Sequence, residues 1–254
     1  MTRSQAAESL YLDLLKKVLT DTLRRREPDI DAPQFIRGFR DHYIRGEAVT
    51  MVPLARLDNV QACLLDVIDR GVPGDVIETG VWRGGMTIFM RGVLAVRGVT
   101  DRRVWVADSF QGLPAPDGDR FPLEAQAHAS SAMTKDYGHF AVSLDDVRAS
   151  FAAFGLLDDQ VCFLPGWFKD TLPAAPIDRL AVLRLDGDYY ESTADALRAL
   201  YDKLSPGGYV IVDDYGEDRW TYCRRAVDEF RRDRGLDDEL RQVDSKCFFW
   251  QRGA

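Results

Sequence analysis

Short apolar runs alternate with amphipathic stretches along most of this chain. A short apolar run is typical of a buried strand, and apolar residues at every third or fourth position are typical of a helix. The alternation predicts an α/β fold with a mainly parallel sheet, because parallel strands need a crossover helix between them. The predicted strands are 76–77, 104–107, 161–164, 181–185, 209–212 and 247–250, and the helices among them are 86–96, 143–154, 192–204 and 222–234.

Two segments break this alternation. Residues 27–55 follow a helix that has leucines at helical spacing from Leu10 to Leu23, and residues 111–143 contain several prolines and glycines. Loops of this length in a compact domain are usually lids, binding loops or disordered segments. We therefore divide the chain into an N-terminal helix and lid segment, residues 1–55, and a main domain, residues 56–254. Within the main domain, residues 115–142 form a second lid or acceptor loop.

Acidic residues follow two of the predicted strands. The run 180–185 ends in Asp186 and Asp188, and the run 209–212 ends in Asp213 and Asp214. Because the carboxyl ends of parallel strands form the ligand crevice, we expect these acids to converge on one point. Carboxylates this close cannot all ionise without a cation, and oxygen ligands suit Mg²⁺. A simpler reading is that they cap helices or form a polar turn, but that reading explains one acid better than four.

A glycine-rich loop, residues 78–85, lies between a predicted strand and a predicted helix. Its glycines do not follow the G-x-G-x-x-G spacing of a pyrophosphate loop, and Glu78 precedes the first of them, Gly80. A carboxylate there repels a pyrophosphate but suits an ammonium or a hydroxyl group, which favours S-adenosylmethionine over a nicotinamide cofactor. Asp108 ends the next strand, where an acid commonly binds ribose hydroxyls. A tight packing turn and a helix cap are the simpler readings of these two features.

Composition narrows the class of partner. The net charge is −8 and the pI is about 5.0, which disfavours nucleic acid and anionic membranes as partners. No apolar run is long enough to span a bilayer. The four cysteines are scattered and form no metal or disulfide pattern, so we expect core thiols in the reducing cytoplasm.

Five stretches carry a specific resemblance. They are residues 74–85, 104–114, 156–176, 180–193 and 204–215. The chain resembles the macrocin O-methyltransferase (TylF) family, which methylates hydroxyls on deoxysugars of glycosylated natural products such as antibiotics. The resemblance implies a class I S-adenosylmethionine-dependent methyltransferase fold, with a Rossmann-like, mostly parallel seven-stranded sheet, an N-terminal helical extension and lid segments. It also implies S-adenosyl-L-methionine and Mg²⁺ as cofactors, a small glycoside as acceptor and a homodimer.

The resemblance assigns roles to particular residues. It implies that Asp186, Asp213 and Asp214 bind the metal and that Asp188 is the general base. Residues 27–52 and 115–142 depart from the family pattern, which leaves the acceptor open. The implied cofactor-binding residues are Thr50, Met51, Glu78, Thr79, Gly80, Arg83, Gly84, Asp108, Ser109, Gly166, Trp167, Phe168 and Asp186.

Three alternatives remain open from the sequence. A catechol-type O-methyltransferase would share the metal chemistry but act on a phenol, which is already acidic and depends less on a base. A nicotinamide dehydrogenase is disfavoured by the loop spacing and by Glu78. A scaffold protein on a decayed methyltransferase fold is disfavoured because every expected acid is present.

Overall fold

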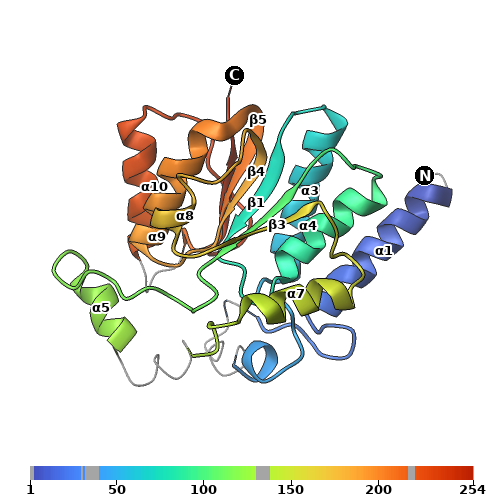
Figure 1. The fold of residues 1–254 in the computed structure, drawn as a ribbon, viewed down its shortest axis with the longest axis horizontal. Helices are drawn as coiled ribbons and strands as arrows, with labels where there is room; N and C mark the ends of the chain where they lie inside the picture. The colour runs from blue at the N-terminus through green and yellow to red at the C-terminus, as the bar shows by residue number, and fades with distance from the viewer. Residues whose placement is uncertain (1–2, 30, 32–39, 130–137, 217–220, 254) are drawn as a thin grey trace.

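A single seven-stranded sheet crosses the molecule, in the order β3-β2-β1-β4-β5-β7-β6 (Figure 1). The computed structural model describes residues 3–29, 31, 40–129, 138–216 and 221–253. Strands β1 to β5 are parallel, β7 is antiparallel to β5, and β6 is antiparallel to β7. The mostly parallel seven-stranded sheet is therefore confirmed. The strands are β1 (Asp75–Thr79), β2 (Val104–Asp108), β3 (Val161–Pro165), β4 (Leu180–Leu185), β5 (Leu204–Val212), β6 (Arg241–Gln242) and β7 (Phe248–Gln251).

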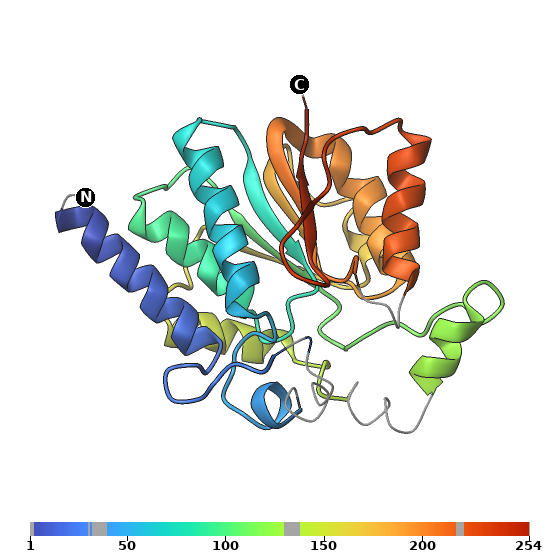
Figure 2. The same cartoon turned by 180° about the vertical axis from the view of Figure 1, so that it is seen from behind.

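Helices cover both faces of the sheet, as the two opposite views show (Figures 1 and 2). On one face, α3 (Leu54–Asp69), α4 (Gly85–Val96) and α7 (Leu144–Ala153) cover the sheet, and α1 (Arg3–Leu19) packs on α4 and α3 from outside. The other face packs against α8 (Phe168–Thr171), α9 (Tyr190–Leu200) and α10 (Thr221–Asp233). Successive strand residues point to opposite faces, so Val182 joins the first hydrophobic cluster and Leu183 the second. The remaining elements are the π-helix η1 (Arg40–Ile44), α5 (Pro122–Ala129) and the 3₁₀-helix η2 (Tyr201–Lys203).

Three elements differ from the prediction. Strand β5 begins at Leu204, so the Ser-Pro-Gly-Gly stretch between the predicted helix 192–204 and the predicted strand 209–212 lies within it, at a shift in the register between β4 and β5. Helix α5 lies in the stretch we predicted to be irregular, parts of which are outside the described residues. Strand β6 is two exposed residues long, which is too short to carry an apolar alternation.

Helix α1 buries one apolar face and exposes another. Leu12, Leu15 and Leu19 are buried in the same hydrophobic cluster as α3 and α4. Gly92 of α4 allows this close approach, because a Cβ there would lie 2.5 Å from the Leu15 side chain. On the outer face, Leu10 is 71% exposed. Helix α1 is thus tied to the main domain by its inner face.

The four cysteines, Cys63, Cys162, Cys223 and Cys247, are all free, and three of them are buried. This agrees with the prediction of core thiols without a disulfide framework. Within the described residues, we find no helix that combines the length and the apolar character needed to cross a membrane.

Candidate active site

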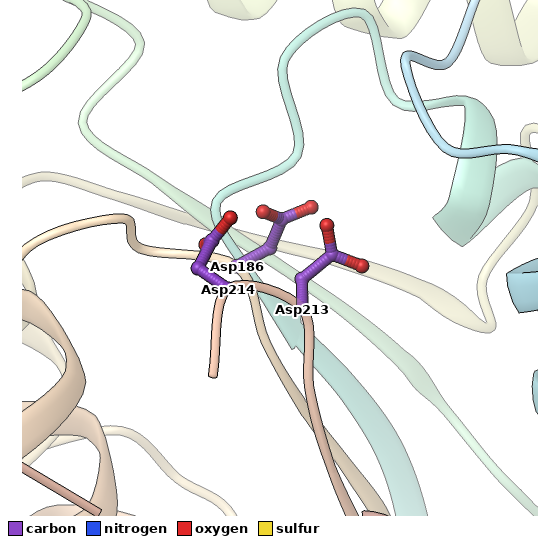
Figure 3. Close-up of side chains that lie close together, drawn as sticks. All are labelled: Asp186, Asp213 and Asp214. Carbon is purple, nitrogen blue, oxygen red and sulfur yellow. The ribbon is translucent and has the colours of Figure 1, made fainter. Parts of the chain in front are cut away.

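The predicted metal ligands meet at the carboxyl edge of the sheet. Leu185 pairs with Val212 across β4 and β5, so the residues that follow these two strands lie side by side. One carboxylate oxygen from each of Asp186, Asp213 and Asp214 lies within 4.8 Å of the others (Figure 3). The topology therefore gathers three carboxylates from two loops at one point.

A buried arginine lies beneath these carboxylates. The guanidinium of Arg184 on β4 is fully buried and donates hydrogen bonds to Glu78, to Asp213 and, at 2.7 Å, to Asp186. A buried charge is tolerated only when it is paired, and here three acids share one cation. Arg184 is not among the predicted site residues, although a charged residue inside the apolar run 180–185 is a visible signal of a buried ion pair.

A second arginine holds Asp213 from the other side. Arg56, in the first turn of α3, donates to the Oδ2 atom of Asp213 and, at 2.6 Å, to Asp244 before β7. Arg184 donates to Oδ1, so each oxygen of Asp213 accepts one guanidinium. A carboxylate oxygen has two lone pairs and can also contact a cation. Arg56 and Asp244 carried no sequence signal, because they lie 157 and 31 positions from Asp213.

The negative charge of this cluster exceeds what the two arginines neutralise. Burial, then the charge of Asp213, raises the pKa of Asp186 to about 6. Burial and the charges of Asp188, Asp186 and Asp213 raise the pKa of Asp214 well above its ordinary value. The Oδ2 atom of Asp214 is buried and has no hydrogen-bond partner among the described residues. An all-oxygen donor set with excess charge and an unpaired oxygen fits a hard divalent cation.

The glycine-rich loop lies beside the cluster. Gly80 has φ +89°, and a Cβ at this position would overlap the carbonyl oxygen of Asp186, so only glycine fits here. Burial raises the pKa of Glu78 to about 8. One oxygen of Glu78 accepts from Arg184, and the other is buried with no partner in the described part of the chain. The structure therefore brings the loop and the acidic cluster to one site.

Asp108, at the end of β2, organises the backbone of this edge. Its two oxygens accept hydrogen bonds from the backbone N–H groups of Val81 and Phe110, each at 2.8 Å. Phe110 and two more non-glycine residues, Trp82 and Asp188, have φ between +50° and +57°. Such backbone strain is concentrated at functional sites. Asp108, which also accepts a hydrogen bond from the Ser109 hydroxyl at 3.4 Å, thus fixes the loop.

The other predicted cofactor residues lie on loops at the same edge. Gly85 donates to the Val49 carbonyl at 3.1 Å and contacts Thr50, which brings Thr50 and Met51 against the glycine-rich loop. The backbone N–H of Gly166 donates to the Asp108 carbonyl at 2.9 Å, which places Trp167 and Phe168 after β3 beside the end of β2. In the same region, Thr79 ends β1, Arg83 donates to the Ala48 carbonyl, Gly84 precedes α4, and Ser109 donates to the Gly112 carbonyl.

Comparison with known proteins decides the family. The chain matches the Macrocin-O-methyltransferase (TylF) family over residues 40–252. The chain belongs to this family. Among curated relatives, the 8-demethyl-8-(2,3-dimethoxy-alpha-L-rhamnosyl)-tetracenomycin-C 4'-O-methyltransferase of Streptomyces olivaceus is 49% identical, with 99% of this chain and 95% of the relative aligned.

Two further relatives of this TylF chain have other named substrates. The demethyldecarbamoylnovobiocin O-methyltransferase of Streptomyces niveus is 48% identical over 96% of this chain and 94% of the relative. The mycinamicin III 3''-O-methyltransferase of Micromonospora griseorubida is 45% identical over 96% of this chain and 97% of the relative. The solved O-methyltransferase NovP has a TM-score of 0.84 at 48% identity, covering 97% of this chain and 100% of that one.

These findings confirm the predicted family and the class I methyltransferase fold, and they make the protein an O-methyltransferase. The dehydrogenase and the non-enzymatic scaffold are excluded by that assignment. The three relatives share O-methyl transfer by name, and the acceptors that their names give differ.

The pKa of Glu78 generates a prediction on stability. Because its folded-state value of about 8 exceeds the ordinary 4.5, the folded protein keeps a proton that the unfolded chain releases. That contribution is complete below pH 4.5 and is lost as the pH rises to about 8. Across this window and without divalent cations, the unfolding free energy of the wild type should fall relative to Glu78→Gln by up to about 1.4 kcal/mol per pH unit.

Urea denaturation at several pH values in this window measures the difference. The exposed Glu239→Gln serves as the matched control and should run parallel to the wild type. If the unfolding free energies of the wild type and Glu78→Gln depend on pH in the same way, Glu78 is ionised across the whole pH window and the prediction is wrong.

Proposed function

We propose that this chain is a Mg²⁺-dependent and S-adenosylmethionine-dependent O-methyltransferase that acts on a sugar hydroxyl of a glycosylated natural product. The observation that carries the proposal is the cluster of Asp186, Asp213 and Asp214, with its excess of negative charge and its unpaired oxygen. Family membership and the names of the relatives support the reaction and the glycoside.

The residues divide into a metal side and a cofactor side. Asp186, Asp213 and Asp214 would hold Mg²⁺, and Arg184 and Arg56 keep two of these carboxylates in place before any cation binds. The cofactor would be held by the glycine-rich loop, Asp108 and the loops around them. When bound, S-adenosylmethionine supplies a methyl group on a sulfonium, and Mg²⁺ supplies a charge that makes a nearby hydroxyl more acidic.

The remaining cofactor-side contacts follow from chemistry and position. The Glu78 oxygen that has no partner among the described residues suits the ammonium group of the cofactor, and Asp108, at the end of β2, is placed where an acid commonly binds ribose hydroxyls. Trp167 and Phe168, which begin the segment after β3, offer aromatic surface for the adenine. The full set that we propose is Thr50, Met51, Glu78, Thr79, Gly80, Arg83, Gly84, Asp108, Ser109, Gly166, Trp167, Phe168 and Asp186.

Asp188 is the proposed general base. It lies two residues after Asp186, in a turn with φ +57°, and its charge contributes to the raised pKa of Asp214. A carboxylate at this point can accept the proton of a hydroxyl group held at the acidic cluster. A sugar hydroxyl is a weak acid and depends on this base, whereas a phenol depends on it less. Much of the remaining acceleration comes from alignment of the two reactants.

The acceptor would lie between the two segments that depart from the family pattern, residues 27–52 and 115–142. In Figure 1, η1 and α5, which belong to these segments, lie at the end of the molecule where the parallel strands terminate. Parts of both segments are outside the described residues. We propose that they form the lids over the glycoside, with the N-terminal lid in residues 1–55 and the second in the main domain.

We also propose a homodimer in the cytoplasm. The outer face of α1 carries an apolar stripe in which Leu10, Leu14 and Val18 are 71%, 50% and 37% exposed. A stripe of this kind on a helix whose other face is buried is suited to a second copy of the chain. The four free thiols favour a reducing compartment.

Transfer of labelled methyl groups tests the function itself. We expect label from S-adenosylmethionine on deoxysugar glycosides such as 4-nitrophenyl α-L-rhamnoside, with Mg²⁺ present and not with a chelator. Asp186→Asn should lower this turnover by about 100-fold or more while circular dichroism shows a folded protein, because the amide keeps an oxygen that can accept from Arg184. Label on catechol alone would overturn the sugar assignment, and full turnover in chelator or in Asp186→Asn would overturn the metal assignment.

Asp188→Asn tests the base. It should lower kcat by about 100- to 10,000-fold, because the amide cannot accept the proton, while the affinity for S-adenosylhomocysteine stays near that of the wild type. Steady-state kinetics and calorimetry measure the two quantities. Asp195→Asn, an aspartate of α9 outside the cluster, is the control. Equal losses of turnover and of cofactor affinity would remove Asp188 from this role.

Leu14→Glu tests the dimer. A charge on the apolar stripe of α1 should convert a dimer to a monomer in sedimentation velocity, because its carboxylate would be buried unpaired in the interface. Leu123→Glu places the same charge on α5, where Leu123 is 64% exposed, and should leave the dimer intact. A wild-type protein that sediments as a monomer at all concentrations would contradict the proposal.

A further inference from the structure

Helix α9 begins directly after the turn that carries Asp188, and no side chain of its own caps it. Its N-cap residue is Tyr189, whose side chain accepts no hydrogen bond from the first turn. The first four N–H groups of a helix need partners from outside the helix. One of them, the N–H of Tyr190, donates at 3.1 Å to the Oε1 atom of Glu124, which is 66 residues away on α5. The capping group of α9 is therefore supplied by the acceptor segment.

The charge of Glu124 is favourable at the N-terminus of α9, but the buried surroundings of its carboxylate are not. A carboxylate at a helix N-terminus is stabilised by the helix dipole. The side chain is nevertheless fully buried, and its Oε2 atom has no hydrogen-bond partner among the described residues. Burial, the largest cause, raises the pKa of Glu124 to about 7. A buried, half-satisfied carboxylate is unfavourable for folding, and such a cost is commonly found where function requires the group.

His128 of α5 and the two residues just before the helix, Arg120 and Phe121, contact the same short stretch of chain. The ring of Phe121 stacks on the ring of Tyr190, with centroids 4.7 Å apart. The Nδ1 atom of His128 lies 2.9 Å from the hydroxyl of Tyr189, and Arg120 forms an ion pair with Glu191 at 3.2 Å. Every one of these contacts falls on the three residues that follow Asp188.

The turn that α5 contacts is strained. Asp188 has φ +57°, a conformation that a non-glycine residue keeps only where its surroundings fix it. On one side, the N–H of Tyr189 donates to the Gly187 carbonyl at 2.6 Å, and the N–H of Asp186 donates to the Thr79 carbonyl at 2.9 Å. On the other side, the next backbone donor, that of Tyr190, is held by Glu124. Glu124 thus adds a bond from the acceptor segment to those that hold this turn.

We propose that Glu124 is a positioning residue for Asp188, and that docking of α5 on the start of α9 sets the orientation of the base. The proposal rests on the role assigned to Asp188 under the proposed function. It makes the acceptor segment part of the catalytic geometry as well as a cover for the acceptor.

Glu124→Ala tests the positioning role. It should lower kcat for 4-nitrophenyl α-L-rhamnoside by about 10- to 100-fold, the range expected for a small misplacement of a reacting group. The affinity for S-adenosylhomocysteine should stay within about twofold, because Glu124 accepts its hydrogen bond from Tyr190, which is not a predicted cofactor residue. Glu124→Gln keeps an acceptor oxygen for Tyr190 and should retain turnover within about threefold. Gln126→Ala, an exposed change on the same helix, is the control.

Hydrogen exchange gives a readout that needs no turnover. In Glu124→Ala the amides of residues 187–192 should exchange faster than in the wild type, while those of β4 stay protected. If Glu124→Ala does not fold, Glu124→Leu fills a similar volume without an acceptor and takes its place. Unchanged exchange at residues 187–192 would overturn the proposal, as would wild-type kcat or a loss of cofactor affinity that matches the loss of kcat.

A double-mutant cycle separates this proposal from the proposed function. If Glu124 acts through Asp188, then Glu124→Ala should cause no further loss of turnover in an Asp188→Asn background. A full additional loss would show that Glu124 acts elsewhere and would overturn the positioning role while leaving the base intact. Wild-type turnover in Asp188→Asn alone would overturn the base assignment first, and the positioning role with it.

Discussion

One buried guanidinium holds the functional edge of this protein together. Arg184 enters the site from the central strand β4 and binds acids that belong to the ends of β1, β4 and β5. Removing one partner of such a buried pair typically costs about 3–5 kcal/mol, because the other is left as an uncompensated charge. The glycine-rich loop and the acidic cluster are therefore parts of a single electrostatic unit, and neither can be rearranged without the other.

Arg56 extends this unit to the antiparallel edge of the sheet. It links Asp213 to Asp244, and Asp244 in turn accepts from the backbone N–H groups of Lys246 and Cys247 at 2.8 Å. The two arginines thus hold the carboxylates of Asp186 and Asp213 in place, while one oxygen of Asp214 has no hydrogen-bond partner in the described part of the chain. A site that is arranged before its cation arrives needs little reorganisation when it binds. On the acceptor side, we propose that α5 likewise holds the turn that carries Asp188 in place through protein contacts.

The sequence predicts the parts of this site that lie at strand ends. Asp186, Asp213 and Asp214 could be placed together because parallel strands terminate at one edge, and no contact had to be known. The helices and central strands can also be predicted from the sequence, because their apolar periodicity is a local property. Helix α5 and the start of β5 cannot be predicted in this way, because proline and glycine are poor guides where tertiary packing overrides local preference.

The residues that the sequence does not reveal are those whose meaning depends on distant partners. Arg56 looks like an ordinary helix residue until Asp213, 157 positions away, is placed beside it. Glu124 has no significance before Tyr190 is known to lie against it. Arg184 is the exception, because a charge within a fully buried strand already demands a partner in any fold.

The most direct test of this account is a crystal structure with Mn²⁺ and S-adenosylhomocysteine, read by the anomalous scattering of the metal. The account predicts one strong peak at the cluster, about 2.0–2.3 Å from an oxygen of each of Asp186, Asp213 and Asp214, with Arg184 and Arg56 still bound to Asp213. A cluster without a peak at saturating Mn²⁺, with the arginines alone neutralising the three carboxylates, would contradict it.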